Sequence, residues 1–303
     1  MTNLHRRPSL FLFNSGLFNT GLFASGLCFG VTLSLVQPTH ANQPAAPPPP
    51  ETCTDAKDCL NKGARANQAK DFVRAARFLP TACEIEPKAC NIVGEIFRQG
   101  QVGVPKDANK AAEFHGKACD KGLILSCAIE AQLRFHGQDG ATVNKPRARS
   151  GFEKSCGPDF FDSCANAGVM YATGDGGPQD LVKARGLYQK ACDGGESTAC
   201  VNLAAMLLNG EGGDADKPKA KAMFADFCGK KNALSCFNLG LIYAKGLEGA
   251  QDLPQALGFL DQGCTLGNQQ ACTTAQQIRD DQAKIAAEAA AAAAKKGAKG
   301  KKK

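Results

Sequence analysis

The residues with the clearest chemistry in this 303-residue chain are its 15 cysteines. Most lie in pairs eight positions apart, and successive pairs follow at steps of 36 or 37 residues. Thiolates can bind zinc, form a redox couple or join as disulfides. The C-x-x-C spacing common to many zinc modules, redox sites and haem-attachment sites is absent, so we expect disulfides, no metal and no cofactor. The pairs are Cys119 with Cys127, Cys156 with Cys164, Cys192 with Cys200, Cys228 with Cys236 and Cys264 with Cys272, together with a tighter copy at Cys83 with Cys90 and a shortened opening at Cys53 and Cys59.

Each cysteine pair belongs to a repeated unit with fixed small and large positions. Eight residues before the first cysteine stands an alanine, and four before it a bulky or ring residue, which places all three on one helix face. After the second cysteine come a small residue, in most copies a ring or leucine three places on, and then a glycine typical of a helix C-cap. The alanines are Ala75, Ala111, Ala148, Ala184, Ala220 and Ala256, and the glycines are Gly100, Gly137, Gly174, Gly210 and Gly246.

Each unit is therefore predicted to be a helix, a loop and a second helix, with the cysteine pair at the turn into the next unit. The sequence does not fix the disulfide connectivity, but chain reversal over about eight residues makes the members of each pair natural partners. We expect an all-α fold: a right-handed αα-superhelix, or solenoid, of about six helix-turn-helix repeats plus a C-terminal capping helix, stapled by disulfides.

Two recurrent stretches give the unit a family resemblance. One is Asn238-Leu239-Gly240-Leu241-Ile242-Tyr243, and the other is Lys190-Ala191-Cys192-Asp193, which is repeated as Lys117-Ala118-Cys119-Asp120. Over roughly residues 53–280 the chain resembles the Sel-one-like repeat, a relative of the tetratricopeptide repeat. With a cysteine pair in each copy it is similar to the Helicobacter cysteine-rich protein (Hcp) group.

The resemblance implies two kinds of function. Repeats of this kind imply a scaffold that binds a partner, whereas the Hcp group also implies penicillin binding or weak β-lactam hydrolysis. The lysine, S-D-N and K-T-G motifs of serine β-lactamases and the histidine cluster of zinc enzymes are missing, so we predict no catalytic residues, although the enzyme alternative stays open. A cysteine-rich relative in the mitochondrial intermembrane space, tied to respiratory-complex assembly and haem, suggests a third role that the bacterial-style leader disfavours.

The ends of the chain differ from the repeats in composition. Residues 1–41 start basic, continue apolar and end in small residues, so we predict a signal peptide cleaved near Ala41 and an exported protein, periplasmic or extracellular. An uncleaved anchor, or a lipoprotein modified at Cys28, is the alternative. We expect a Pro-rich linker at 42–52, the repeat solenoid at 53–282, and an Ala-rich helix end with a disordered Lys-rich tail at 283–303.

The net charge of +7 does not indicate a nucleic-acid-binding fold. Residues 1–41 contribute +2 and residues 283–303 contribute +6, which leaves the repeats at about −1. Only the tail is strongly basic. It is predicted to be a solubilising end, with contact to an anionic polymer or lipid as the alternative.

The second full repeat departs from the pattern, with Glu130 and Arg134 where other copies have apolar and ring residues. Either they form an ion pair beside the core, or the helix is rotated to point Ile129, Leu133 and Phe135 inward; we expect the rotation because a buried pair is costly to desolvate. His115 stands at the large position and is predicted to be a packed ring.

We expect the function to be partner binding through a concave helical groove lined by the first helix of each repeat. The partner, a protein, a peptide or another envelope component, is not identified by the sequence. By analogy with tetratricopeptide grooves, the candidate contact residues are Lys88, Asn91, Glu95, Arg98, Gln132, Val169 and Phe237.

Overall fold

The computed structural model describes residues 51–300, with side chains as far as residue 293. The chain divides after Thr52 into two units, and the second contains all the helices described below. The predicted signal peptide and residues 42–50 of the predicted linker lie outside the described residues.

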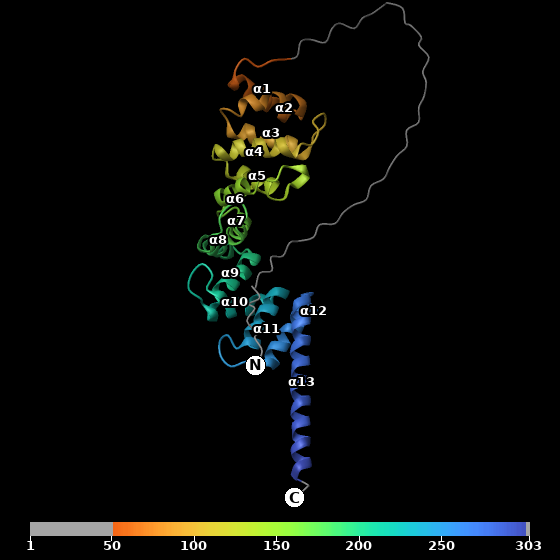
Figure 1. The fold of residues 1–303 in the computed structure, drawn as a ribbon. Helices are drawn as coiled ribbons and strands as arrows, with labels where there is room; N and C mark the ends of the chain where they lie inside the picture. Colours follow the sequence, from red (N-terminus) through yellow and green to blue (C-terminus); the bar gives the residue numbers. More distant parts are fainter. Residues whose placement is uncertain (1–50, 301–303) are drawn as a thin grey trace, which may run out of the picture. The chain divides into compact units, whose positions relative to one another are not determined.

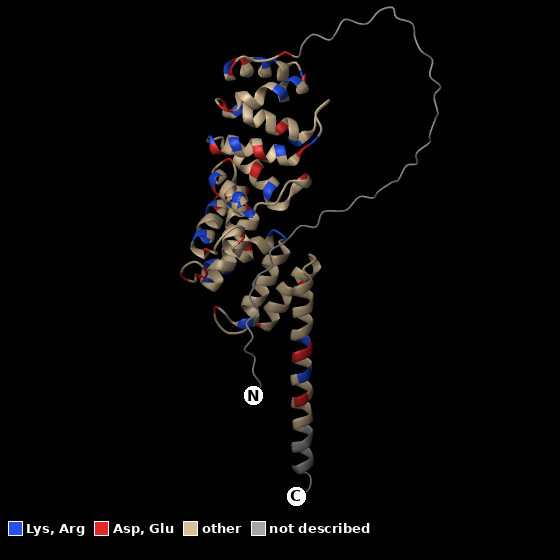
Figure 2. Cartoon of the chain, turned by 45° about the horizontal axis from the view of Figure 1, so that its top comes forward, with Lys and Arg blue, Asp and Glu red and all other residues tan. Residues whose placement is uncertain are grey.

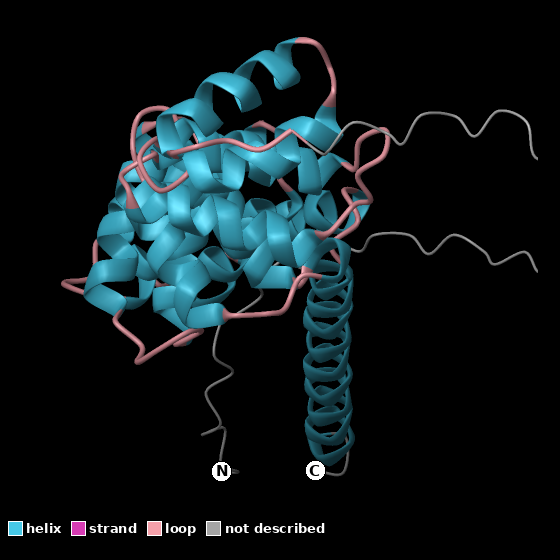
Figure 3. Ribbon diagram, turned by 90° about the horizontal axis from the view of Figure 1, so that it is seen from above, coloured by secondary structure: helices cyan, strands magenta, loops and turns pink. Residues whose placement is uncertain are grey.

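Thirteen α-helices and one short 3₁₀ helix make up the described part of the chain, which contains no β-strand (Figures 1 and 3). Consecutive helices pack against each other and give six pairs followed by a last helix, so the predicted all-α solenoid stapled by disulfides is confirmed. The helices are α1 (Ala56–Gln68), α2 (Phe72–Ala82), α3 (Pro87–Gln99), α4 (Ala108–Asp120), α5 (Ile124–His136), α6 (Lys145–Ser155), α7 (Phe161–Thr173), α8 (Leu181–Asp193), α9 (Ser197–Asn209), α10 (Lys217–Gly229), α11 (Ala233–Lys245), α12 (Leu253–Thr265) and α13 (Gln269–Gly300), with η1 (Gln138–Gly140) between α5 and α6.

The ends of these helices follow directly from residue type. Every even-numbered helix begins after an Asp or Asn whose side chain accepts the backbone N–H three residues on. Such a cap stabilises a helix by about 1 kcal/mol. From α3 to α11 every odd-numbered helix ends at one of the predicted glycines, with φ between 60° and 78°, which a residue with a Cβ rarely adopts.

The repeated alanine and the large residue after it form the centre of each helix pair. All six alanines have no exposed surface, and Tyr188 and Phe224 are at most 1% exposed. Gly168 of α7 shows why the facing residue must be small, because a Cβ there would stand 2.8 Å from the Tyr188 ring. The close approach of the paired helices therefore depends on this small position.

Disulfides link each even-numbered helix to the odd-numbered helix that follows it, and one further disulfide joins the segment before α1 to α1 itself. Seven disulfides join the two members of each predicted pair, with Cα–Cα distances between 4.5 and 5.1 Å, which lie within the usual range for disulfides. No bridge joins distant copies, so each staples one local turn. The bridges are Cys53 to Cys59, Cys83 to Cys90, Cys119 to Cys127, Cys156 to Cys164, Cys192 to Cys200, Cys228 to Cys236 and Cys264 to Cys272.

The second cysteine of most of these pairs is buried in the packed interior. Cys90 and Cys164 have no exposed surface, and Cys127 is 1% exposed. Cys200 is also buried, at 5% exposed, whereas Cys272 near the end of the array is only half-buried. The sulfur atoms therefore form part of the packed interior as well as the covalent link between repeats.

The first and last parts of the array have features of their own. α2 contains Pro80, which has no N–H to donate within the helix, and ends two residues later at Ala82. α13 packs through Ala271 and Ala275, and an ion pair of 2.6 Å joins Arg279 to Asp261 of α12. Beyond residue 280 its described side chains are all exposed. No helix among residues 51–300 is long and apolar enough to span a membrane.

Charged residues of both signs are interspersed along the repeats rather than separated into single-sign faces (Figure 2). Many of them form ion pairs within one helix or between neighbouring helices. This distribution agrees with a repeat block of small net charge.

Candidate functional site

A row of equivalent side chains runs along the odd-numbered helices, three residues after the small position. We call Phe97, Arg134, Tyr171, Leu207 and Tyr243 the ring row. The backbone carbonyl of each accepts the N–H of the residue that caps the following helix, at 2.8–3.0 Å. The same contact therefore sets the position of the row in every repeat.

The three aromatic members of the ring row are only partly buried, and each lies against a cation. Lys110 Nζ lies 5.0 Å from the Phe97 ring centroid, and Lys221 Nζ lies 4.7 Å from that of Tyr243. Tyr171 has two cations, with Lys183 Nζ at 4.3 Å and the Arg149 guanidinium carbon at 4.5 Å. Cation–π contacts at these distances hold the rings in place while leaving part of their surface to solvent.

The hydroxyl group of Tyr171 is held by hydrogen bonds to two charged side chains. Its hydroxyl donates to Glu153 Oε2 at 2.5 Å and accepts from Lys183 Nζ at 2.8 Å, and Lys183 also pairs with Glu153 Oε1. The hydrogen bond to Glu153 raises the pKa of Lys183. Burial alone would raise the pKa of Glu153, but the hydrogen bonds from Lys183 and Tyr171 hold it below its ordinary value. The three groups thus form an ion pair that holds the phenol of Tyr171 in a fixed position.

A pocket of about 570 Å³ opens beside Tyr171. It is lined by Arg149 of α6, by residues 178–182 at the start of α8, and by the backbone of Gly212 and Gly213 in the next loop. The volume lies within the range of small-ligand sites, roughly 300–1,000 Å³.

The structure places four of the predicted groove residues, Lys88, Asn91, Glu95 and Arg98, on α3. Arg98 and Glu95 pair at 2.8 Å, and Asn91 Oδ1 accepts from the Ser126 hydroxyl at 2.9 Å, so these three make internal contacts. Lys88 is exposed. None of the four lines the pocket.

The other three groove candidates lie on separate odd-numbered helices. Gln132 of α5 is exposed and Val169 of α7 is half-buried. Phe237 of α11 is a correction to the prediction, because it is only 7% exposed and contributes to the interior instead of a contact surface. The side chain of the residue directly after the second cysteine therefore points inward in that repeat.

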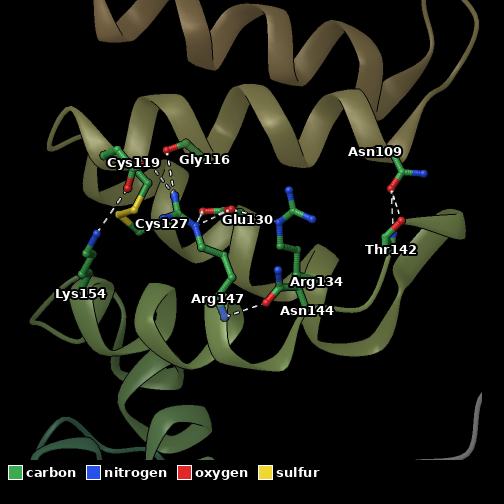
Figure 4. Close-up of polar contacts among 11 residues, drawn as sticks. Asn109, Gly116, Cys119, Cys127, Glu130, Arg134, Thr142, Asn144, Arg147 and Lys154 are labelled. Atoms are coloured by element: carbon green, nitrogen blue, oxygen red, sulfur yellow. Dashed lines mark hydrogen bonds and ion pairs between the residues drawn. A yellow bond between two sulfur atoms is a disulfide. The ribbon is translucent and has the colours of Figure 1, made fainter. Parts of the chain in front are cut away.

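The prediction that α5 rotates to expose Glu130 is wrong. The Glu130 side chain is 2% exposed and accepts from Arg134 Nε at 3.1 Å and from Arg147 Nε at 2.9 Å (Figure 4). Arg147 also pairs with Asp120 at 2.8 Å and donates to the Gly116 carbonyl at 3.3 Å. The hydrogen bonds to Glu130 and Asp120 raise the pKa of Arg147. Two arginines and several hydrogen bonds thus offset the desolvation of one carboxylate.

His115 is a packed ring, as predicted, with no exposed surface. Neither ring nitrogen has a hydrogen-bond partner, although Glu95 Oε1 lies 3.6 Å from Nε2. Burial lowers the pKa of His115 to about 4, and the carboxylate of Glu95 offsets only part of that effect. The imidazole is therefore neutral at pH 7 and is shielded from any substrate. Within residues 51–293 no group of three or more His, Cys, Asp or Glu side chains could hold a metal ion.

Sequence reasoning missed the cluster around Tyr171 and the pocket beside it. A signal was present, because a basic residue follows the repeated alanine in three successive units, at Arg149, Arg185 and Lys221. Whether these basic residues face a pocket depends on how close the loop after the next helix passes to them. That distance is set by the fold and cannot be read from the sequence.

The profile of the Sel1 repeat matches four stretches of the chain, which are residues 87–123, 161–196, 197–225 and 233–268. The chain is a Sel1-repeat protein. The remaining units, including the copy with Glu130, have the same helix pairing and disulfide although the profile does not reach them.

Two frog proteins share part of the sequence of this Sel1-repeat protein. Over 89 residues it is 37% identical to cytochrome c oxidase assembly factor 7 of Xenopus tropicalis and 34% identical to assembly factor 7A of Xenopus laevis. The match covers 29% of this chain and 38% of each relative, so it spans well under half of those proteins.

A solved structure shows the same fold. A protective antigen of uropathogenic Escherichia coli strains, which displays an SLR fold, aligns at a TM-score of 0.52 and 23% identity over 71% of this chain and 47% of the antigen. The cysteine-rich protein B of Helicobacter pylori aligns at 21% identity over 56% of this chain and 95% of that protein, with a TM-score of 0.27.

Proposed function

We propose that this Sel1-repeat protein is an exported, disulfide-stapled scaffold that binds another protein or envelope component through the surface of its odd-numbered helices. The observation that carries the proposal is the ring row, in which three half-buried aromatic rings, each with a cation against it, recur along the array. Tyr and Arg, which the row brings together at Tyr171 and Arg149, are among the side chains that contribute most to the binding energy of protein–protein contacts.

Export is supported by the sulfur chemistry. Seven disulfides, each closing a short loop, are stable in an oxidising compartment and are rare in a reducing cytosol. The basic and apolar residues 1–41 have the composition of a signal peptide. We therefore keep the domain boundaries expected from the sequence and place the mature protein in the periplasm or outside the cell, with the Lys-rich tail free to contact an anionic polymer or lipid.

The frog relatives agree with the proposed scaffold function in one respect. Their name states that they are assembly factors of cytochrome c oxidase, a role that is exercised on other proteins. The resemblance supports a scaffold and names no partner.

The test is partner capture with variants of the ring row. The oxidised protein, immobilised without residues 1–41, should retain a specific partner from envelope extract, and Tyr171→Ala together with Tyr243→Ala should reduce the amount at least tenfold. Val102→Ala is the matched control, because Val102 is 90% exposed and lies outside the row. Equal capture by the double variant, or no capture by any form, would count against the proposal.

A further inference from the structure

Two arginines stand at equivalent positions of successive repeats near Tyr171. Arg149 lines the pocket, whereas Arg185 is not part of the lining and lies against the loop that contains Gly213. Arg149 follows the buried Ala148, and Arg185 follows the buried Ala184. Arg149 Nη1 donates to the Pro178 carbonyl at 3.0 Å, and Arg185 Nη1 donates to the Asp214 carbonyl at 2.9 Å. Each guanidinium group is thus held against the loop that follows the next odd-numbered helix.

Neither arginine has a carboxylate within 4 Å in the described part of the chain, although most cations near the ring row do have one. Lys221, which stands at the equivalent position in the next repeat, pairs with Glu248 at 3.7 Å. The acidic group that acts on Arg149 at longer range is Glu153, which already bonds to Lys183 and Tyr171. The two guanidinium groups therefore keep donor capacity for an added acceptor.

The pocket is not uniformly positive, because Asp180 also contributes to its lining. Asp180 Oδ1 caps α8 by accepting the backbone N–H of Lys183 at 2.9 Å, so that carboxylate is directed at the helix start. A free multivalent anion is disfavoured by this arrangement. A ligand that places a single carboxylate at Arg149 and a neutral group near Asp180 fits it better.

Gln179 also lines the pocket, and its side-chain amide donates to the Ala172 carbonyl at 2.7 Å. Apart from Tyr171, the remaining lining residues are apolar or have no side chain. Leu181 is half-buried, and Val182 is 71% exposed, which is unusual for a valine in a repeat with a well-packed interior. Gly212 has φ +69°, and a Cβ there would lie 2.2 Å from the Leu181 carbonyl, so this wall of the pocket must be glycine. An exposed aliphatic side chain beside a bare backbone wall leaves room for one apolar side chain of a ligand.

We propose that this pocket binds an extended segment of a partner protein in which an acidic side chain stands next to an apolar one. The carboxylate accepts from the Arg149 guanidinium, which the Tyr171 ring and the Pro178 carbonyl hold in position. The apolar side chain covers Val182, and Arg185 meets the next acceptor along the segment. This assignment rests on the scaffold function proposed above, because it names the chemistry of the bound partner.

The experiment selects peptides instead of assuming one. Random twelve-residue peptides displayed on phage are selected on the immobilised oxidised protein, and the most enriched sequence is synthesised with a fluorescent label. The expected consensus contains Asp or Glu beside Leu, Ile, Val or Phe, and replacing that acid by its amide should weaken binding at least tenfold.

Variants of the protein locate the site. Arg149→Met and Val182→Glu should each raise the Kd at least tenfold, the first by removing the donor and the second by adding a like charge at the pocket mouth. Arg77→Met is the matched control, because it removes an arginine from α2 that also lies over a ring and is far from the pocket in the repeat order. Val182 is largely exposed, so its variant tests the site even if Arg149→Met disturbs the loop.

The outcomes separate this inference from the scaffold function. Enriched peptides that bind Arg149→Met and Val182→Glu as tightly as the parent protein overturn the pocket assignment and leave a binding scaffold standing. Enriched peptides without acidic residues overturn the proposed ligand chemistry. A selection that enriches no peptide argues against both.

Discussion

The buried carboxylate of Glu130 allows a sharp test of how the second repeat is stabilised. Glu130→Ala removes hydrogen bonds to Arg134 and Arg147 from a position that is 2% exposed. Breaking a buried ion pair costs roughly 3–5 kcal/mol. Because the Arg134 and Arg147 side chains are 19% and 32% exposed, water can solvate part of each guanidinium, and Arg147 keeps Asp120. We therefore expect a loss of about 3 kcal/mol in the free energy of unfolding.

A second variant distinguishes a lost ion pair from a lost side chain. Glu130→Leu combined with Arg134→Tyr gives this repeat the apolar and ring residues of the α11 copy. Arg147 would then be placed over the introduced ring, as the equivalent Lys183 is placed near the ring of Tyr171. A well-packed apolar replacement of a buried ion pair is often neutral or stabilising. The free energy of unfolding of the double variant should therefore be within about 1 kcal/mol of that of the parent protein, or higher.

The measurement is urea unfolding followed by circular dichroism with the disulfides intact, supported by amide hydrogen exchange in α5 and α6. Glu113→Ala is the control, because its ion pair with Lys117 is largely exposed and should contribute less than about 0.5 kcal/mol. The reasoning is refuted if Glu130→Ala behaves like Glu113→Ala, or if the double variant is as unstable as the alanine variant.

Three further results are expected. The pKa of His115, lowered by burial to about 4, means that the unfolded chain binds the proton more tightly, so stability should rise by about 3 kcal/mol between pH 4 and pH 6.5. His115→Phe should flatten that slope in pH-dependent unfolding. Replacing Cys228 and Cys236 by serine opens a loop of nine residues and should cost about 2.5 kcal/mol in urea unfolding. Gly168→Ala places a Cβ 2.8 Å from the Tyr188 ring and should lower stability by about 2 kcal/mol, whereas the exposed Gly186→Ala should not.

Much of the fold could be predicted because each repeat contacts its neighbours and little else. The period of the alanines, large residues and glycines depends on local helix geometry, and the helix pairs and their ends are where that pattern places them. The placement of Glu130 could not be predicted in the same way. It depends on Arg147, which is 17 residues away and arrives from the next helix to satisfy the carboxylate.

The candidate site was harder to predict for a related reason. The groove residues were all taken from the odd-numbered helices, whereas the pocket is assembled from an arginine of α6, the start of α8 and a glycine loop after α9. A one-residue difference in register decides whether a side chain such as Phe237 lies inside or outside. Spacing along a single helix does not contain that information.

The ring row connects the stability of the repeats to the surface that we propose for binding. The residue that lies against the Tyr171 ring, Lys183, is also the residue whose backbone N–H is capped by Asp180. The backbone N–H of Lys110, at the same position in α4, is capped by Asp107, and its side chain lies over the Phe97 ring. Truncating Lys183 would keep the cap, which uses the backbone N–H, but it would remove the ion pair with Glu153 together with the cation on the ring. Such a variant would therefore change folding and binding together. Substitutions at exposed lining residues such as Val182 separate the two effects, and a binding defect there with unchanged unfolding is the result that assigns this surface to a partner.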